Sequence, residues 1–195
     1  MIGIILCGGQ STRMNNNDKG LVLLNTKTLT HIAFESLSRL SIPILISINE
    51  HQEINYANKF NSNLLIIDNP SLSIKGPLRG ILSAHLQNPN DDFFILACDL
   101  PLIDFHLLKE LFIKYQQNKS FDAFVFTNDN EMEPLCGIYT TNALQKTIAL
   151  YSGNKLIKNS MKFVLSNLNV YTIKLAESQK RSFKNFNTIS DLDGI

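Results

Sequence analysis

The chain has 195 residues, of which 44% are hydrophobic and 18% charged, and its formal net charge is +1. These values are ordinary for a globular protein, and a chain of this length divides poorly into two domains, so we expect one domain over residues 1–195. A charge this close to neutral gives no electrostatic case for nucleic acid or an anionic membrane as a partner. Any anionic ligand must therefore be held by local charges.

The sequence shows no targeting or membrane segment. It begins with an apolar run typical of a buried strand and has no basic leader, signal core or stretch of about 20 apolar residues. We therefore expect a cytoplasmic protein. The cysteines Cys7, Cys98 and Cys136 are odd in number and widely spaced, which favours small buried side chains over disulfides or a metal site.

Strand and helix patterns alternate along the chain. Apolar runs predict strands at 2–7, 44–48, 64–67, 93–98, 123–126 and 170–175. Helical spacing of apolar residues follows the first run at 29–40 and the fourth at 104–117. Because several strands are apolar throughout, helices should cover both faces, and the fold class is α/β with a mainly parallel sheet.

The most informative segment is LCGGQSTRM, over residues 6–14, which joins the first strand to a glycine turn. Adjacent Gly8 and Gly9 allow backbone N–H groups to converge on phosphate oxygens, and Arg13 and Lys19 supply positive charge. This pattern indicates a cradle for a nucleoside triphosphate. The alternative is a glycine turn that only closes a βα unit.

Better-known sites do not fit this sequence. A Walker A loop requires Lys and Ser or Thr where this chain has Gly9 and Gln10, and no GxGxxG follows the first strand. The four histidines lack HxxxH or HExxH spacing, and there is no GxSxG segment. Zinc sites and hydrolase triads are therefore unsupported.

Polar residues follow the predicted strands, where ligands bind in parallel sheets. They are Gly8, Gly9, Ser47, Asn49, Asp68 and Asp99. Asp99 precedes Leu100 and Pro101, which end the strand, so its carboxylate should emerge at the sheet edge. Mg²⁺ needs only one or two protein carboxylates when substrate phosphates complete its shell, so Asp99 is the predicted metal ligand. Its alternative role is a helix cap or a turn.

Two further segments each leave two interpretations open. GPLRG, at 76–80, precedes a helical pattern and either binds substrate or simply starts that helix. NFNTISDL, at 185–192, is either a binding turn or the cap of a last helical turn.

Taken in order, LCGGQSTRM with Asp18-Lys19, GPLRG, CDLP, EPLCGIY and NFNTISDL resemble the molybdenum cofactor guanylyltransferases of the MobA type over essentially the whole chain. The resemblance implies the nucleotide-diphospho-sugar-transferase-like fold, a three-layer α/β/α sandwich with a Rossmann-like sheet. It implies Mg²⁺-dependent transfer of GMP from GTP to molybdopterin-bound molybdenum, with release of diphosphate. Transient partners would be molybdenum-insertion and molybdoenzyme maturation proteins.

The resemblance also implies residue roles. The nucleotide-binding residues would be Leu6, Cys7, Gly8, Gly9, Ser11, Lys19, Asp68 and Asp99. The catalytic residues would be Arg13 and Lys19, which hold the triphosphate and the leaving diphosphate, and Asp99, which binds Mg²⁺. The substrate-binding residues would be Gly80, Asn185 and Asn187. An acceptor phosphate is already ionised at pH 7, so this chemistry needs alignment and charge neutralisation rather than a general base.

The sequence departs from the family pattern at four places. Cys7 replaces an alanine, Asn15 a glycine, and Arg79 the alanine of GPLAG, while Ser47, two residues before Asn49, stands where an asparagine often contacts the nucleotide. Two alternatives stay open: a CTP-dependent molybdopterin or sugar-phosphate nucleotidyltransferase, and a catalytically silent nucleotide-binding module. The cytidine enzymes tend to read LAAG at the first turn, so the two glycines favour guanine.

Overall fold

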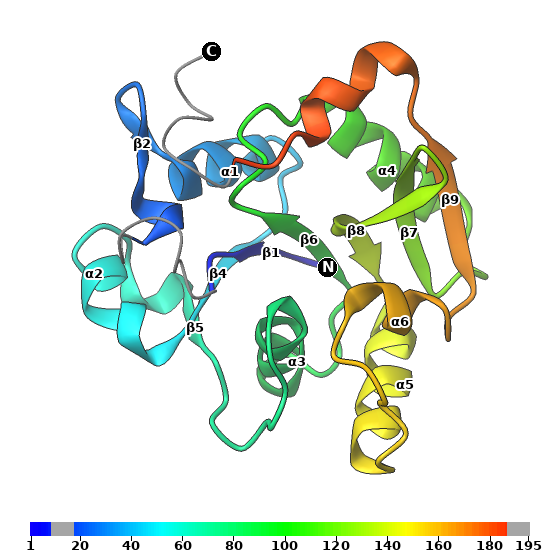
Figure 1. Cartoon of the computed structure of the whole chain (residues 1–195). Coiled ribbons are helices and arrows are strands. Elements are labelled where there is room, and N and C mark those ends of the chain that lie inside the picture. The colour runs from blue at the N-terminus through cyan, green and yellow to red at the C-terminus, as the bar shows by residue number, and fades with distance from the viewer. Residues whose placement is uncertain (9–17, 187–195) are drawn as a thin grey trace.

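A computed structural model describes residues 1–8 and 18–186. Its centre is a seven-stranded sheet in the order β5-β4-β1-β6-β8-β7-β9 (Figure 1). The strands are β1 (Ile2–Leu6), β4 (Ile44–Ile48), β5 (Leu65–Ile67), β6 (Phe93–Ala97), β7 (Ala123–Asn128), β8 (Glu131–Tyr139) and β9 (Val170–Lys174). β8 is antiparallel to β6 and β7, and the other pairs in this sheet are parallel. A separate hairpin joins β2 (Leu23–Leu24) to β3 (Lys27–Thr28).

Helices cover both faces of the sheet (Figure 1). One face packs against α1 (Leu29–Ser38), α2 (Glu53–Ala57) and α4 (Phe105–Gln117), and the other against α3 (Pro77–Gln87), α5 (Thr141–Ser152) and α6 (Met161–Leu165). Short 3₁₀ helices are η1 (Lys19–Leu21), η2 (Glu50–Gln52), η3 (Ser62–Leu64) and η4 (Glu177–Phe183). The predicted α/β/α sandwich with a mainly parallel sheet is confirmed.

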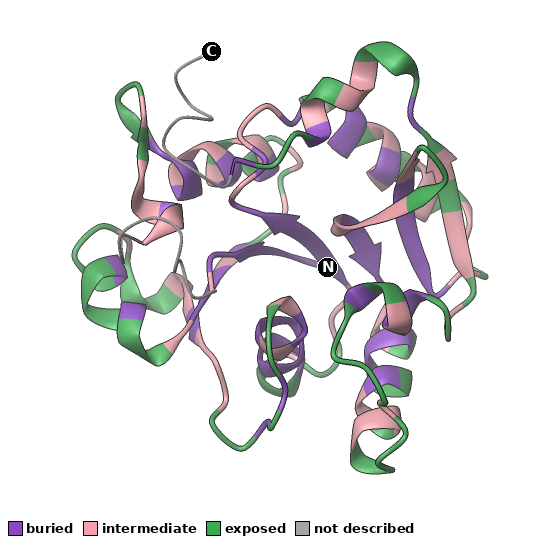
Figure 2. Cartoon of the chain, in the orientation of Figure 1, coloured by how far each residue is buried: buried purple, intermediate pink, exposed green. Residues whose placement is uncertain are grey.

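The alternation of side chains along β1 explains the two cores. Ile4 belongs to the core beneath α3 and α5, whereas its neighbour Ile5 belongs to the core beneath α1 and α4. Both are fully buried, and Figure 2 shows the central strands as the most buried part of the molecule. Burying a side chain of this size stabilises the fold by about 1.5–3 kcal/mol. A strand with helices on both faces must therefore be apolar throughout.

The predicted strands and helices are present, with ends shifted by one or two residues. Asp104 accepts a hydrogen bond from the His106 N–H and caps α4. GPLRG begins α3, with Pro77 in its first turn and Gly76 at φ +72°, which confirms the interpretation that this segment starts a helix. No helix in residues 1–8 and 18–186 is long and apolar enough to cross a membrane. The single domain over 1–195 stays a prediction.

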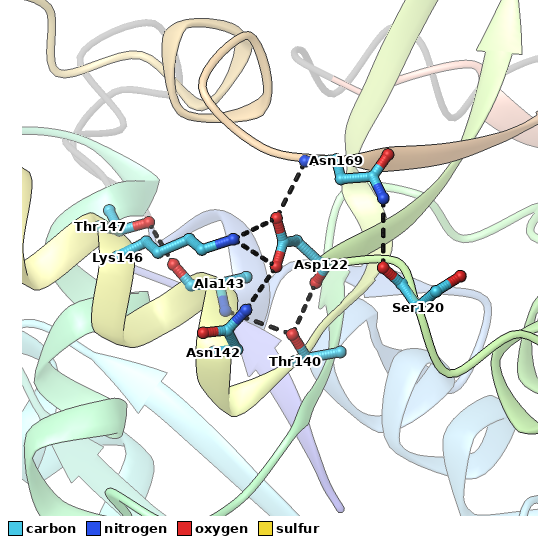
Figure 3. A network of polar contacts seen from close by, with 8 residues as sticks. All are labelled: Ser120, Asp122, Thr140, Asn142, Ala143, Lys146, Thr147 and Asn169. Carbon is cyan, nitrogen blue, oxygen red and sulfur yellow. Dashed lines mark hydrogen bonds and ion pairs between the residues drawn. The ribbon is translucent and has the colours of Figure 1, made fainter.

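Asp122, directly before β7, is the centre of a network of polar contacts (Figure 3). Its carboxylate accepts hydrogen bonds from the Asn142 side chain at 2.7 Å and from the Asn169 backbone at 2.9 Å, and it pairs with Lys146 at 2.8 Å. The Thr140 hydroxyl donates to the Asp122 carbonyl. These contacts tie β7 to α5 and to the turn before β9, and together they lower the pKa of the Asp122 carboxyl although burial opposes this.

We predict that Asp122→Ala lowers the free energy of unfolding by about 3 kcal/mol, because it leaves buried donors unpaired. Lys146→Met is the matched control. The lysine side chain is 49% exposed against 6% for Asp122, so its removal should cost less than about 1 kcal/mol. Urea unfolding of both variants tests this contrast, and equal losses would show that the ion pair, not the buried hydrogen bonds, provides the tie.

His85 makes the stability of the protein depend on pH. It is 4% exposed on α3, its Nδ1 has no hydrogen-bond partner among the described residues, and burial lowers its pKa from the usual 6.5. As pH falls below 6.5, the unfolded chain binds a proton at this position more readily than the folded chain, because the pKa is lower in the folded chain. Stability therefore decreases as pH falls through 6.5.

We predict that the loss of unfolding free energy between pH 7.5 and 5.5 is smaller in His85→Leu than in the wild type, by up to about 1.4 kcal/mol. The exposed His106 provides the control, and His106→Leu should retain the wild-type difference. Urea unfolding at the two pH values measures both. An unchanged difference in His85→Leu would contradict the burial argument.

Candidate functional site

The carboxyl ends of four parallel strands meet at one edge of the sheet. Gly8, two residues after β1, donates its backbone N–H to the Ser47 carbonyl of β4 at 3.2 Å. Asp68, after β5, donates its N–H to the Ile48 carbonyl at 2.9 Å. Asp99 follows β6, the other neighbour of β1. Parallel pairing thus gathers residues that are far apart in the sequence.

A cleft of about 460 Å³ opens at this edge. Its lining residues are Leu6, Gly8, Ser47, Asn49, His51, Asp68, Ile74, Lys75, Gly76, Pro77, Arg79 and Gly80. The structure therefore brings together Leu6, Gly8, Asp68 and Gly80 from the predicted site. His51, Lys75 and Ile74 were missed; Lys75 directly precedes GPLRG, whereas nothing in the sequence marks His51 or Ile74.

Asp68 is the acidic residue that lines the cleft. Its Oδ1 is buried and has no hydrogen-bond partner within the described part of the chain. Burial raises the pKa of this carboxyl, and the nearby Arg79 guanidinium opposes the rise. Arg79 donates through Nε and Nη2 to the Asn69 carbonyl at 3.3 and 3.2 Å, so this side chain is held against the cleft. An acceptor oxygen is left for a ligand that carries N–H or O–H groups.

Lys19 and Asp99 form an ion pair, although they are 80 positions apart. Lys19 Nζ lies 2.7 Å from Asp99 Oδ2, and the two side chains are 19% and 22% exposed. Asp99 Oδ1 is buried without a partner among the described residues. One oxygen of the carboxylate is thus paired, and the other is left as an unsatisfied acceptor.

This unsatisfied oxygen fits a magnesium ligand. The described residues contain no group of three or more His, Cys, Asp or Glu side chains that could hold a metal ion. Mg²⁺ needs no such group, because waters and substrate phosphates fill the positions that one carboxylate leaves open. The donor set therefore suits magnesium bound together with a phosphate ligand better than a permanently bound metal.

Cys7 points away from the cleft. Its Sγ lies 3.3 Å from the Thr30 hydroxyl in the core beneath α1, and it is not among the residues that line the cleft. The thiol of Cys98 interacts with that of Cys7, and this contact together with burial raises the Cys98 pKa well above its usual value. Cys136 is buried as well, so all three cysteines are the small buried side chains expected.

The end of the described chain returns to the same edge. The Phe186 N–H donates to the Asp99 carbonyl at 3.0 Å, which brings the exposed Asn185 into the neighbourhood of the metal candidate. The predicted residues Gly9, Ser11, Arg13 and Asn187 lie outside the described residues, and their roles stay predictions.

The cleft lies at the carboxyl edge of a mostly parallel sheet, together with the ion pair of Lys19 and Asp99. This arrangement is typical of α/β proteins that bind ligands beyond the carboxyl ends of their strands. A family model described as the MobA-like NTP transferase domain matches residues 3–168. The chain belongs to this family, as the motifs predicted.

Individual relatives match over nearly their whole length. A probable molybdenum cofactor guanylyltransferase of Flavobacterium johnsoniae is 31% identical over 191 residues, covering 98% of this chain and 94% of the relative. One of Methanocaldococcus jannaschii is 30% identical over 200 residues, covering 97% and 95%. The crystal structure of molybdopterin-guanine dinucleotide biosynthesis protein A from Archaeoglobus fulgidus superposes with a TM-score of 0.78 at 23% identity, covering 99% and 95%. The similarity to this crystal structure supports the assignment of the fold.

The close packing of Gly80 against Ser47 gives a test of the cleft geometry. A Cβ added to Gly80 would lie 2.4 Å from Ser47 Oγ. We predict that Gly80→Ala lowers the free energy of unfolding by about 1–3 kcal/mol. The double variant Gly80→Ala/Ser47→Ala should recover most of this loss, because the clashing oxygen is absent. Urea unfolding of the single and double variants measures both, and a loss that persists in the double variant would contradict the contact.

Proposed function

We propose that this protein transfers GMP from GTP to the molybdenum-bearing molybdopterin cofactor, forming the guanine dinucleotide cofactor and diphosphate. Its relatives carry the name of this activity, and they align with nearly the entire chain. The observation that carries the proposal is the Lys19–Asp99 pair, with Asp99 Oδ1 unsatisfied, beside a cleft lined by Gly8 and Asp68.

In this proposal the cleft holds the nucleoside. Leu6 and Gly8 form the floor where β1 ends, and Asp68 Oδ1 accepts a hydrogen bond from the base or the ribose. Ser47 and Asn49 supply further polar groups in the place where the family often uses an asparagine. The triphosphate extends from the cleft toward Lys19, with Arg13 as the second cation expected from the sequence.

Asp99 would hold magnesium through its unsatisfied Oδ1. When bound, the ion would offset negative charge on the nucleotide phosphates and on diphosphate as it leaves. Lys19 acts on the same charge from the protein side, since its ammonium lies within ion-pairing distance of Asp99. Concentrating positive charge in a partly buried site strengthens its interaction with phosphate.

The reaction is a direct displacement at the α-phosphorus. An oxygen of the pterin phosphate forms the new P–O bond, and the bond from the α-phosphorus to the bridging oxygen of the leaving diphosphate breaks. The acceptor oxygen is ionised at neutral pH, so this chain needs to supply no general base and no covalent nucleophile. Its residues contribute alignment and charge stabilisation.

The acceptor would bind where the end of the chain meets Asp99. Asn185 lies in the segment that reaches this residue, and Asn187 is the second proposed acceptor contact. Gly80, the third residue proposed for the acceptor, lies in the cleft beside Ser47. The proteins that insert molybdenum and those that receive the product would approach this open edge. Localisation in the cytoplasm belongs to the same proposal.

Turnover with GTP, CTP and ATP tests the function, using MgCl₂, molybdate-charged molybdopterin as acceptor and diphosphate release as the signal. We predict GTP-selective release that falls by about 10²-fold or more in Asp99→Asn, because a carboxylate that holds the metal is lost. Asp104→Asn is the matched control. That carboxylate caps α4 nearby and is exposed, so this variant should keep its activity.

Each other outcome selects an alternative. GTP binding without diphosphate release would favour the silent nucleotide-binding module. Selective use of CTP would show that the two glycines of the first turn do not select guanine. Full activity in Asp99→Asn would remove Asp99 from the metal site while leaving the transfer reaction in place.

A further inference from the structure

Lys19 can act on phosphate only if the short turn that carries it is held still. The turn is η1 (Lys19–Leu21), a three-residue helix that follows Asp18. Asp18 Oδ1 accepts the Gly20 N–H at 3.0 Å, and the Asp18 carbonyl accepts the Leu21 N–H at 3.0 Å. So short a helix has little stability of its own, and its position depends on what holds Asp18.

Two buried side chains from a different part of the chain hold Asp18. Gln52, 7% exposed, donates from Nε2 to Asp18 Oδ2 at 2.5 Å. Tyr56, fully buried on α2, donates its hydroxyl to Asp18 Oδ1 at 3.1 Å. Neither side chain is among the residues that line the cleft, and both contact Asp18 instead.

Gln52 also joins this turn to the two strand ends of the site. Its Nε2 donates to the Cys7 carbonyl at 3.0 Å, directly before Gly8, and its Oε1 accepts the Asn49 N–H at 2.8 Å. One amide therefore connects the turn of Lys19 with the ends of β1 and β4. Such a fully satisfied buried amide specifies a single arrangement of the segments that it joins.

Gly20 shows how closely the turn is seated. The Thr30 hydroxyl donates to the Gly20 carbonyl at 2.7 Å. A Cβ on Gly20 would lie 2.2 Å from the Tyr56 hydroxyl and 2.7 Å from Thr30 Oγ1. No side chain fits between the turn and the residues beneath it, so the turn rests directly on Tyr56 and Thr30.

We propose that Gln52 and Tyr56 are positioning residues, which hold Asp18 so that the Lys19 ammonium stays beside Asp99 at the phosphate end of the site. This inference rests on the proposed function for the role of Lys19, whereas the contacts themselves do not depend on it. Residues that act only through Lys19 should lose their effect on catalysis once Lys19 is removed.

A double-mutant cycle on the full chain tests this inference. Tyr56→Phe, which removes a single hydroxyl, should lower kcat about tenfold and Gln52→Met about 10²-fold, with the KM for GTP changed by less than about threefold in Tyr56→Phe. In the Lys19→Ala background, Tyr56→Phe should change kcat by less than about twofold. Tyr115→Phe is the matched control. It removes a tyrosine hydroxyl that donates to Asp92, which precedes β6 and therefore lies at the edge of the sheet opposite the site, so kcat should not change.

A second measurement needs no substrate. Amide hydrogen exchange at Gly20 and Leu21 should accelerate by about tenfold or more in Tyr56→Phe and Gln52→Met, and not in Tyr115→Phe. Unchanged exchange at these two amides would overturn the inference, and so would a tenfold loss of kcat that persists in the Lys19→Ala background. If the wild type releases no diphosphate while exchange accelerates as expected, the proposed function fails and the positioning contacts stand.

Discussion

The parallel pairing of β1 with β4 on one side and β6 on the other is the constraint on which the site depends. It fixes where Gly8 lies relative to Asp99 and, together with the parallel pairing of β4 and β5, relative to Asp68. The carboxyl ends of these strands all lie at the same edge of the sheet. Because these central strands are buried on both faces, a change of register would move apolar side chains out of two cores at once. The positions of the polar groups are therefore secured by apolar packing that none of them takes part in.

The electrostatic interactions at the carboxyl edge of the sheet come from a few neighbouring charged side chains. The chain is almost neutral, yet Lys19 is paired with Asp99, and Arg79 faces Asp68. Both acidic residues keep one buried oxygen without a partner in the described structure. Unsatisfied buried acceptors are costly in a finished interior and useful in a site that awaits a ligand. By contrast, Asp122 has every carboxylate oxygen engaged, as expected for a residue that serves only the fold.

The sequence was sufficient to predict elements whose signal is local. Apolar runs identified the parallel strands, and strand-end position identified Asp68 and Asp99. β8 was missed because it begins with Glu131, Glu133 and Pro134, and only its last four residues are buried, so it lacks the continuous apolar run of its neighbours. Its insertion makes the sheet mixed.

The direction in which a side chain points could not be predicted from the sequence either. Cys7 lies within the most informative motif, yet alternation along the strand turns it into the core. Gln52 and Tyr56 carry no motif, and their contact with Asp18 arises only when segments 34 and 38 positions apart are folded together. Pairwise contacts of this kind depend on the assembled fold, and a pattern of residue types along the chain cannot encode their geometry.

The hydrogen bond from the Phe186 N–H to the Asp99 carbonyl has a consequence for how the site matures. The residue proposed to hold the metal is in its final surroundings only after the segment at Phe186 has docked beside it. This segment follows all seven strands of the sheet in the sequence, so during synthesis it leaves the ribosome after them. The sheet and the nucleotide cleft can therefore assemble on a growing chain before the metal end of the site is completed.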